Sequence, residues 1–186
     1  MNNKTSAFIS RVVICSIIVF VIRFMIGKTI SANVGFNILD YVGFISDTIA
    51  VTSIFAGLYI SVLWRHDPFL KAPKLYESYS GVLHSEYNGK DILSRLAIKQ
   101  TLFSVSIKLY TNESESHTIA ASIDTVYDSD KLTYSYSNEP RMDVRKRSEI
   151  HYGTAILNID NPKHIYGEYF TDRNTCGNMD FTADEE

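Results

Sequence analysis

The stretch TIAVTSIFAGLYISVLW, residues 48–64, contains no charged residue and is followed at once by the polar run RHDP, residues 65–68. A helix rises about 1.5 Å per residue, so this stretch, extended back to Tyr41, can cross a hydrocarbon core of about 30 Å. Gly57 and several hydroxyl side chains suit a membrane helix, where small residues let neighbouring helices pack closely. The alternative is a buried helix of a soluble protein. We predict a transmembrane helix that ends at Trp64.

A second apolar segment precedes this one, VVICSIIVFVI at residues 12–22. Extended to residues 7–27, it also reaches membrane length. A secretory signal peptide has a similar charged start and apolar core, but Arg23 and Lys28 lie where a small-residue cleavage site would be expected. We therefore predict a first transmembrane helix, and residues 1–67 as a two-helix transmembrane hairpin.

Charged residues near the predicted helices bear on how the hairpin sits in a membrane. Arg23 can extend its long side chain to the head groups, or it can pair with Asp47 near the start of the second helix. Basic residues are more frequent on the outer sides of the hairpin than in its connector, and the positive-inside rule then places both termini in the cytoplasm. The basic residues counted are Lys4, Arg11, Lys28, Arg65, Lys71 and Lys74.

The two parts of the chain differ in composition. Residues 1–64 hold four basic and two acidic residues, whereas residues 65–186 hold the other 14 basic and 19 acidic ones. This acidic balance argues against a general nucleic-acid surface, which needs a broad basic face. The cysteines, Cys15 and Cys176, lie in different parts of the chain and have no spacing typical of a metal site, so we expect neither an internal disulfide nor a bound metal.

After residue 68 the apolar pattern becomes that of strands. In TLFSVSIKLY, residues 101–110, Phe103, Val105, Ile107 and Leu109 alternate with polar side chains, as in a half-buried strand. Similar runs occupy residues 79–87, 117–126, 132–138, 150–159, 165–171 and 175–181. Turn-forming clusters separate them at Asn88-Gly89 and at residues 111–114, 128–130, 138–140 and 160–162.

Seven or eight short antiparallel strands in a tail of this length indicate either a sandwich or an up-and-down β-barrel. We favour an eight-stranded antiparallel barrel, because a closed barrel leaves no exposed strand edge and has room for at most a small ligand. Residues 68–186 are thus predicted to be one cytosolic β-barrel domain.

The final strand pair, IYGEYFTDRNTCGNMDF, carries the first candidate site. With a period of two, Gly167, Tyr169, Thr171 and Arg173 share one face. If that face is directed inward, a buried Arg173 needs an anion or a carboxylate beside it. Since no inward acidic residue is evident, a phosphate-bearing ligand is the candidate.

A second candidate face holds Tyr134, Tyr136 and Asn138. Tyrosine rings can stack on nucleic-acid bases, which contributes about 1–3 kcal/mol per base. Gln100 and Ser80 are further candidates for reading polar base edges. The alternative is that these tyrosines are ordinary residues of a half-buried sheet, where aromatic side chains are common.

The sequence contains no recognisable catalytic motif. His117 and His151 lie on predicted strands without a serine or cysteine nucleophile near them in sequence, and no glycine-rich phosphate loop is present. The basic cluster Arg141, Arg145, Lys146 and Arg147 is interpreted as a solvated loop, with contact to anionic lipid as the alternative. We expect a protein that is not an enzyme.

The order of these features resembles a known family. Two transmembrane helices followed by a β-rich domain are similar to the two-transmembrane β-barrel effectors of bacterial cyclic-oligonucleotide anti-phage (CBASS) systems. The resemblance covers essentially the whole chain. Its residues are Tyr79-Ser80-Gly81, Gln100, LTYSYSNEP (132–140), HYGTAIL (151–157) and GEYFTDRNTCG (167–177).

The resemblance implies an eight-stranded barrel like those of lipocalins and avidin, with a cyclic dinucleotide bound inside as the activating ligand and no other cofactor. It further implies a cyclic-nucleotide synthase as functional partner, oligomerisation in the bacterial inner membrane, bilayer disruption and death of the infected cell. We expect Arg173 to meet a phosphate and Tyr134, Tyr136 or Tyr169 to stack on bases. Two alternatives stay open, namely a membrane-anchored lipocalin-like binder of a small apolar ligand, lined by Phe103, Val105, Ile107 and Leu109, and a membrane-bound hydrolase.

Overall fold

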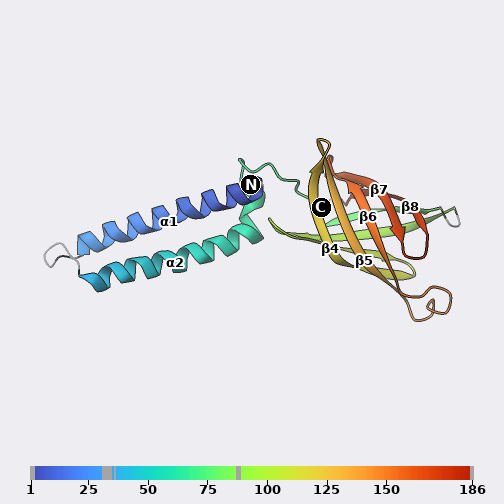
Figure 1. Ribbon diagram of the computed structural model, residues 1–186, viewed down its shortest axis with the longest axis horizontal. Helices are drawn as coiled ribbons and strands as arrows, with labels where there is room; N and C mark the ends of the chain where they lie inside the picture. The colour runs from blue at the N-terminus through green and yellow to red at the C-terminus, as the bar shows by residue number, and fades with distance from the viewer. Residues whose placement is uncertain (1–2, 31–34, 36, 87–88, 185–186) are drawn as a thin grey trace. The chain divides into compact units, whose positions relative to one another are not determined.

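Two long helices form the N-terminal part of the protein (Figure 1). Helix α1 spans Asn3–Ile30 and α2 spans Ile38–Ser61, followed by the short 3-10 helix η1, Leu63–His66. The computed structural model describes residues 3–30, 35, 37–86 and 89–184. Both long helices are apolar and long enough to cross a membrane, which confirms the predicted pair of candidate spans.

The second helix begins and ends earlier than the hydropathy pattern predicts. Asn37 caps its N-terminus by accepting hydrogen bonds from the backbone N–H groups of Leu39 and Asp40, at 2.9 and 3.1 Å. The Asp40 carboxylate accepts from the Asn37 backbone N–H at 2.8 Å, completing a capping box. At the other end, the predicted final residue, Trp64, belongs to η1. The capping residues thus fix the start at Ile38.

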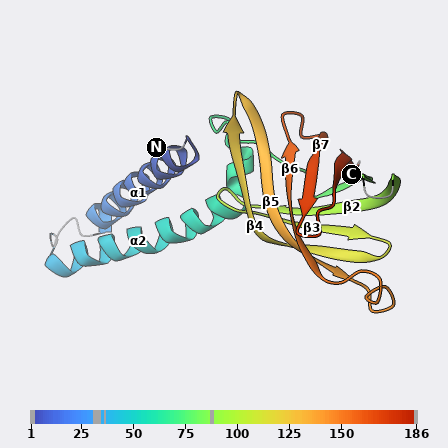
Figure 2. The ribbon, with the colours of Figure 1, turned by 45° about the vertical axis from the view of Figure 1, so that its right-hand side comes forward.

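The helices α1 and α2 lie side by side in both ribbon views (Figures 1 and 2) and make polar contacts with each other. Arg23 Nε lies 2.5 Å from Asp47 Oδ2, so the ion pair across the hairpin is formed. The Ser16 hydroxyl donates to the Thr52 hydroxyl at 3.2 Å. Within an apolar surrounding, such contacts hold the two helices in one register.

A second ion pair joins α1 to the segment that follows η1. Arg11 donates from Nε and Nη2 to the two carboxylate oxygens of Asp67, at 2.8 and 3.0 Å. The Tyr59 hydroxyl and the Phe69 backbone N–H also donate to this carboxylate, at 2.7 and 2.9 Å. The side chain of Asp67 is only 6% exposed, and the bonds from Arg11 hold its pKa well below the usual carboxyl range.

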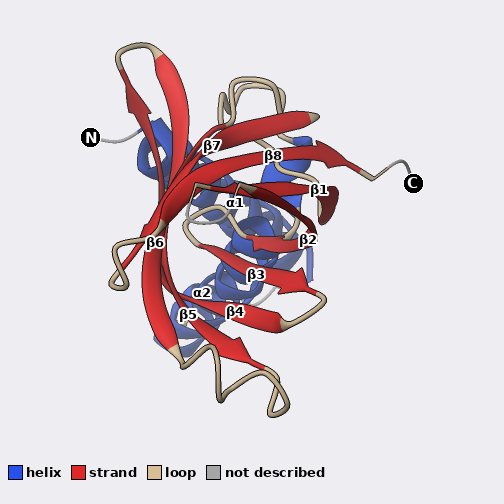
Figure 3. Cartoon of the chain, turned by 90° about the vertical axis from the view of Figure 1, so that its right-hand side faces the viewer, coloured by secondary structure: helices blue, strands red, loops and turns tan. Residues whose placement is uncertain are grey.

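Eight antiparallel strands close into a barrel in which each strand pairs with the next and β8 returns to β1 (Figure 3). This confirms the predicted up-and-down barrel. The strands are β1 (Ser78–Ser85), β2 (Lys90–Gln100), β3 (Val105–Thr111), β4 (Ser114–Val126), β5 (Ser129–Pro140), β6 (His151–Asn158), β7 (His164–Thr171) and β8 (Cys176–Ala183).

The strand boundaries depart from the sequence pattern in three places. Strand β2 was absent from the predicted runs, and the predicted run 101–110 is a turn followed by β3, so Phe103 lies in the turn and is half exposed. The β4–β5 hairpin turns at Tyr127 and Asp128, both with positive φ, one residue earlier than predicted. Asn88, in the predicted Asn88-Gly89 turn, lies outside the described residues.

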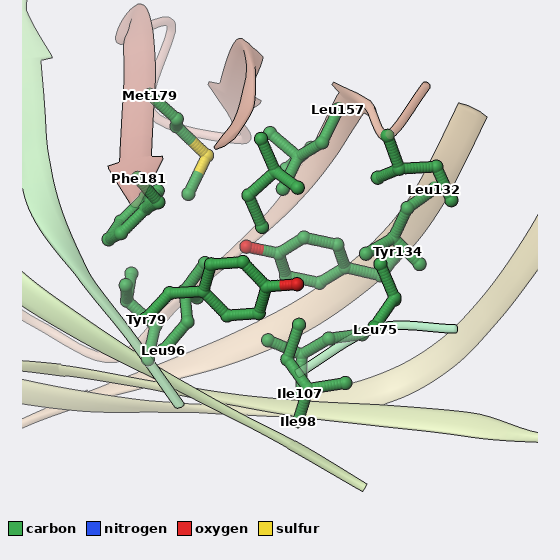
Figure 4. Close-up of a cluster of buried hydrophobic side chains, with 14 of the residues drawn as sticks. Leu75, Tyr79, Leu96, Ile98, Ile107, Leu132, Tyr134, Leu157, Met179 and Phe181 are labelled. Carbon is green, nitrogen blue, oxygen red and sulfur yellow. The ribbon is translucent and has the colours of Figure 1, made fainter. Parts of the chain in front are cut away.

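By contact, the chain divides into a helical unit, Met1–Ala72 with Thr101–Phe103, and a barrel unit, Pro73–Gln100 with Ser104–Glu186. The helical unit has its own buried cluster of Tyr59, Trp64, Leu70 and Leu102. The barrel has a larger core, part of which Figure 4 shows. From the sequence, we predicted a boundary between residues 67 and 68, whereas the contacts place it between Ala72 and Pro73.

Candidate functional site

The barrel interior changes character from one end to the other. We call the end that carries the β1–β2, β3–β4, β5–β6 and β7–β8 turns the polar end, and the opposite one the apolar end. Near the apolar end the inward residues are mostly aliphatic or aromatic: Leu75, Tyr79, Leu96, Ile98, Ile107, Leu132, Leu157, Ile159, Ile165 and Phe181. Toward the polar end four buried polar residues, Ser85, Ser94, Ser116 and Asn138, lie among the inward hydrophobic residues Leu83, Leu109 and Met179.

Strand β5 places the predicted residues Tyr134, Tyr136 and Asn138 on the interior face, as the period-two pattern predicts. The rings of Tyr134 and Tyr136 are 5.7 Å apart between centroids, at an angle of 42°. The Asn138 side-chain oxygen accepts from the Ser116 hydroxyl at 2.8 Å. These residues form a continuous row that runs from the middle of the barrel to its polar end.

The two tyrosines are neutral phenols at physiological pH. Burial raises the pKa of Tyr134, and the neighbouring Tyr136 raises it further. Burial also raises the pKa of Tyr136, with the nearby Tyr169 and Asp172 adding to the effect. The Tyr134 hydroxyl is buried and has no hydrogen-bond partner within the described part of the chain. A buried hydroxyl without a partner costs about 1–3 kcal/mol, so this atom is suited to receive a polar group of a ligand.

Glycines lie directly across from two of the inward tyrosines. Gly153 on β6 pairs with Tyr136, and a Cβ atom there would stand 2.5 Å from the tyrosine ring. Gly177 on β8 pairs with Tyr169, and a Cβ atom there would stand 2.9 Å from that ring. At Gly153 the Tyr136 ring is the nearest obstacle to a larger residue, whereas at Gly177 the His84 backbone carbonyl is closer still, at 2.1 Å, so both positions need glycine.

Strand β7 turns Tyr169 and Thr171 inward, at the same end of the barrel as Asn138. The inward register predicted for Arg173 is wrong. The strand ends at Thr171, and Arg173 lies exposed in the β7–β8 turn, where alternation no longer applies. Its Nη1 donates to the Ser148 hydroxyl at 3.2 Å. Arg173 thus stands on the rim of the polar end, and its role as a ligand contact stays a prediction.

More basic residues surround this rim. The β5–β6 loop carries the predicted basic cluster, which is exposed to solvent as expected and is anchored by buried Val144. Arg147 pairs with Glu113 of the β3–β4 turn at 2.5 Å, and Arg141 donates to the Asn112 carbonyl at 3.2 Å. The loop therefore brings positive charge to the end of the barrel where the interior is polar.

Gln100 and Ser80 do not join the other candidate residues. Gln100 is buried at the apolar end, where its side chain binds the backbone of Pro73 and Leu75. Ser80 points outward from β1, since its neighbours Tyr79 and Gly81 occupy the inward positions. The hydroxyls of Ser78 and Ser80 bond the Asp184 carboxylate and lower its pKa. Sequence spacing alone could not distinguish Gln100 and Ser80 from the candidates at the polar end, because it does not say which face of each strand is directed inward.

The sequence analysis missed several polar-end residues. Ser116 contacts Asn138, and Thr175 shares a hydrogen bond of 2.6 Å with Thr171. Gly153 and Gly177 had been quoted within motifs without a role. A glycine inside a strand run is itself a signal of close approach, and it could have indicated which tyrosines lie inside.

These observations define a class of protein, a β-barrel with a polar, tyrosine-lined end on a pair of candidate membrane-spanning helices. Residues 70–183 match the family described as "Cap15, cyclic dinucleotide receptor domain", and the chain belongs to this family. It is also 25% identical over 183 residues to "CD-NTase-associated protein 15" of Staphylococcus schleiferi, covering 96% of this chain and 97% of that protein. Both findings confirm the resemblance to CBASS membrane effectors.

Proposed function

We propose that a cyclic dinucleotide binds in the polar end of the barrel and makes this chain an active anti-phage effector. The observation that carries the proposal is the buried Tyr134 hydroxyl, which has no hydrogen-bond partner among the described residues and lies next to a row of inward tyrosines and polar residues. An apolar ligand would leave this hydroxyl unpartnered, whereas a nucleobase offers both donors and acceptors. The family's description supports the choice of ligand.

Each part of the ligand has a matching group. Tyr136 and Tyr169 present rings for base stacking, while Asn138 and Thr171 offer polar atoms for base edges or sugar hydroxyls. Arg173 and the β5–β6 loop arginines lie at the rim, where their guanidinium groups can form charge-assisted bonds with phosphates. This assignment puts the bases inside and the charged backbone of the ring near solvent, which limits the cost of burying charge.

The response to the ligand is a change in the membrane. Bound barrels associate, the hairpins gather in the bacterial inner membrane with both termini in the cytoplasm, and the bilayer is disrupted, which kills the infected cell. A ligand can drive association only by binding the assembled state more tightly than the single chain. The name of the staphylococcal relative supports a link to a cyclic-nucleotide synthase that makes the ligand. No step of this scheme requires catalysis by the chain itself.

The test is a thermal-shift measurement on the full chain in detergent, with 3′,3′-cyclic di-GMP, cyclic di-AMP and cyclic GMP–AMP as probes. Saturating ligand should stabilise the barrel by about 3–4 kcal/mol at 100 to 1,000 times Kd. Arg173→Ala should reduce the affinity about tenfold through loss of a charge-assisted bond, while the outward Ser80→Ala should bind like the wild type. A response to long-chain fatty acids alone would favour the apolar-ligand alternative, to which the inward Ile107 and Leu109 contribute.

The Tyr134→Phe variant should change stability and affinity in opposite directions. Without ligand, removing an unpartnered buried hydroxyl should stabilise the barrel by about 1 kcal/mol and raise Tm by several degrees. With a cyclic dinucleotide, the lost hydrogen bond should weaken binding about tenfold. Thermal unfolding and calorimetric titration of the full chain measure the two effects. Higher stability with unchanged affinity would show that the ligand does not reach this hydroxyl.

A further inference from the structure

Two segments of the chain connect the barrel unit with the helical unit. The first crosses at Ala72 and Pro73, just before β1, and the second is the β2–β3 turn, Thr101–Phe103. Leu70 and Leu102, one from each segment, are buried with Tyr59 and Trp64 in the helical unit. The Leu102 backbone N–H donates to the Ile60 carbonyl at 3.0 Å, so the β2–β3 turn is bonded directly to the end of α2.

Gln100 contacts both connecting segments. It is the last residue of β2, directly before the Thr101–Phe103 turn, and its side chain binds the segment that precedes β1. Its Oε1 accepts from the Leu75 backbone N–H at 3.0 Å, and its Nε2 donates to the Pro73 carbonyl at 2.8 Å. Both polar atoms of this buried amide are thus engaged with backbone. A glutamine suits this position, because its amide offers a donor and an acceptor side by side, as an extended backbone segment needs for its carbonyl and N–H groups.

The segment held by Gln100 also enters the barrel core. Leu75 is 1% exposed and belongs to the core that contains Tyr79, Ile98 and Ile107, some of which appear with it in Figure 4. The Tyr79 hydroxyl fixes the same segment, because it accepts from the Tyr76 N–H at 3.0 Å and donates to the Pro162 carbonyl at 2.7 Å. Part of the core at the apolar end of the barrel is therefore supplied by the segment that leads into β1.

Tyr134 belongs to this core as well, and Figure 4 shows its ring among the same side chains as Leu75. The side chains of a close-packed interior leave little free space, so a displaced side chain moves its neighbours. Such an interior tends to switch between discrete packing arrangements and does not deform gradually. A ligand that reaches the Tyr134 hydroxyl from the polar end acts on the packing that holds Leu75.

We propose that Gln100 and Leu75 form the coupling element of the receptor, through which ligand in the barrel changes the membrane hairpin. Gln100 is then a positioning residue that does not read the ligand. It ties Leu75 to the end of β2, and β2 leads directly into the turn bonded to α2. This inference rests on the proposed function, since it needs a ligand inside the barrel.

The direct test is hydrogen exchange on the full chain in detergent, with and without the cyclic dinucleotide that gives the largest thermal shift. The reporters are the amides of Leu75 and Leu102, which donate to Gln100 Oε1 and to the Ile60 carbonyl. Ligand should slow the exchange of both by about threefold or more, beyond any change at the amide of an exposed loop residue such as Lys71. A thermal shift with unchanged exchange at both amides would overturn the coupling and leave the proposed function intact.

Variants separate coupling from binding. Gln100→Met has a similar size but can make neither hydrogen bond, and the matched control is Lys99→Met, on the exposed face of the same strand. In proteoliposomes, Gln100→Met should keep Kd within about threefold while ligand-dependent dye release falls about tenfold or more. Lys99→Met should match the wild type in both measurements.

Each outcome has a distinct meaning. Loss of binding in parallel with dye release would place Gln100 in the ligand site and overturn the proposal, as would normal dye release from Gln100→Met. If that variant does not fold, Leu75→Val decides, because it keeps both backbone hydrogen bonds and trims only the buried side chain; it should show the same separation of binding from release. Absence of any ligand response in the wild type would instead contradict the proposed function.

Discussion

Replacing Asp67 with alanine should destabilise the helical unit by about 3 kcal/mol, because it leaves Arg11 without its partner. The carboxylate accepts two bonds from Arg11 and one each from Tyr59 and the Phe69 backbone, and its side chain is 6% exposed. Removing Asp67 from this partly buried pair should cost more than the pair itself contributes, since the remaining charge and hydroxyl lose their carboxylate partner. Trp64, the one tryptophan of the chain, is buried beside Tyr59 and reports unfolding of this unit by fluorescence.

Two comparisons define the origin of the effect. Asp67→Asn keeps one acceptor oxygen, enough for either the Tyr59 hydroxyl or the Phe69 N–H, which donate to different oxygens of Asp67, and it loses the charge. Its midpoint should therefore lie between those of the wild type and Asp67→Ala. Lys71→Ala, an exposed change in the same segment, should stay within about 0.5 kcal/mol of the wild type. A wild-type midpoint for Asp67→Ala would show that the ion pair gives no net stability.

The Asp67 carboxylate should also make the stability of the helical unit depend on pH. The pKa of Asp67 in the folded state lies below its ordinary value of 3.8, so its contribution is complete above the unfolded pKa and declines as the pH falls toward the folded pKa. The difference in stability between the wild type and Asp67→Asn should therefore be constant near neutral pH and shrink below about pH 4.

The sequence was sufficient for those features that depend on periodicity. An uncharged apolar run predicts α2, and alternation with turn signals predicts strands whose number and length favour a closed barrel. It was insufficient for features that are determined by a contact between residues far apart in the sequence, or where the alternation is interrupted. The Arg11–Asp67 pair joins residues 56 apart, and strand β2 was overlooked because KDILSRLAIKQ begins with four exposed residues that interrupt the alternation.

The candidate site shows the same division. Tyr134, Tyr136 and Asn138 lie inside because they fall within one regular strand, so the period-two pattern applies to them. Arg173 departs from the pattern because β7 ends two residues before it. Gln100 is a buried polar residue, as a site residue would be, but its amide is used by the backbone of Pro73 and Leu75. Only the tertiary structure distinguishes a polar group that awaits a ligand from one that already has partners.

Replacing Tyr136 with leucine should weaken cyclic dinucleotide binding about 30-fold. A ring stacked on a base contributes about 1–3 kcal/mol, and 2 kcal/mol corresponds to roughly this factor in Kd. Leucine keeps much of the buried apolar volume opposite Gly153, so the barrel should remain folded. Tyr136→Phe preserves the ring and should bind within about threefold of the wild type, which separates stacking from the hydroxyl. Calorimetric titration of the full chain in detergent measures both.

The control for this prediction is Tyr152→Leu. Tyr152 lies on β6, next to Gly153, but points outward and is largely exposed. Its replacement should leave Kd unchanged, because a ligand inside the barrel does not reach the outer face. Equal losses for Tyr136→Leu and Tyr152→Leu would mean that the outer face takes part in binding, and no loss for Tyr136→Leu would remove its ring from the site. A loss confined to Tyr136→Leu and absent from Tyr136→Phe would place a base on the inner tyrosine row, where the phosphates of a small ring reach the arginines of the rim.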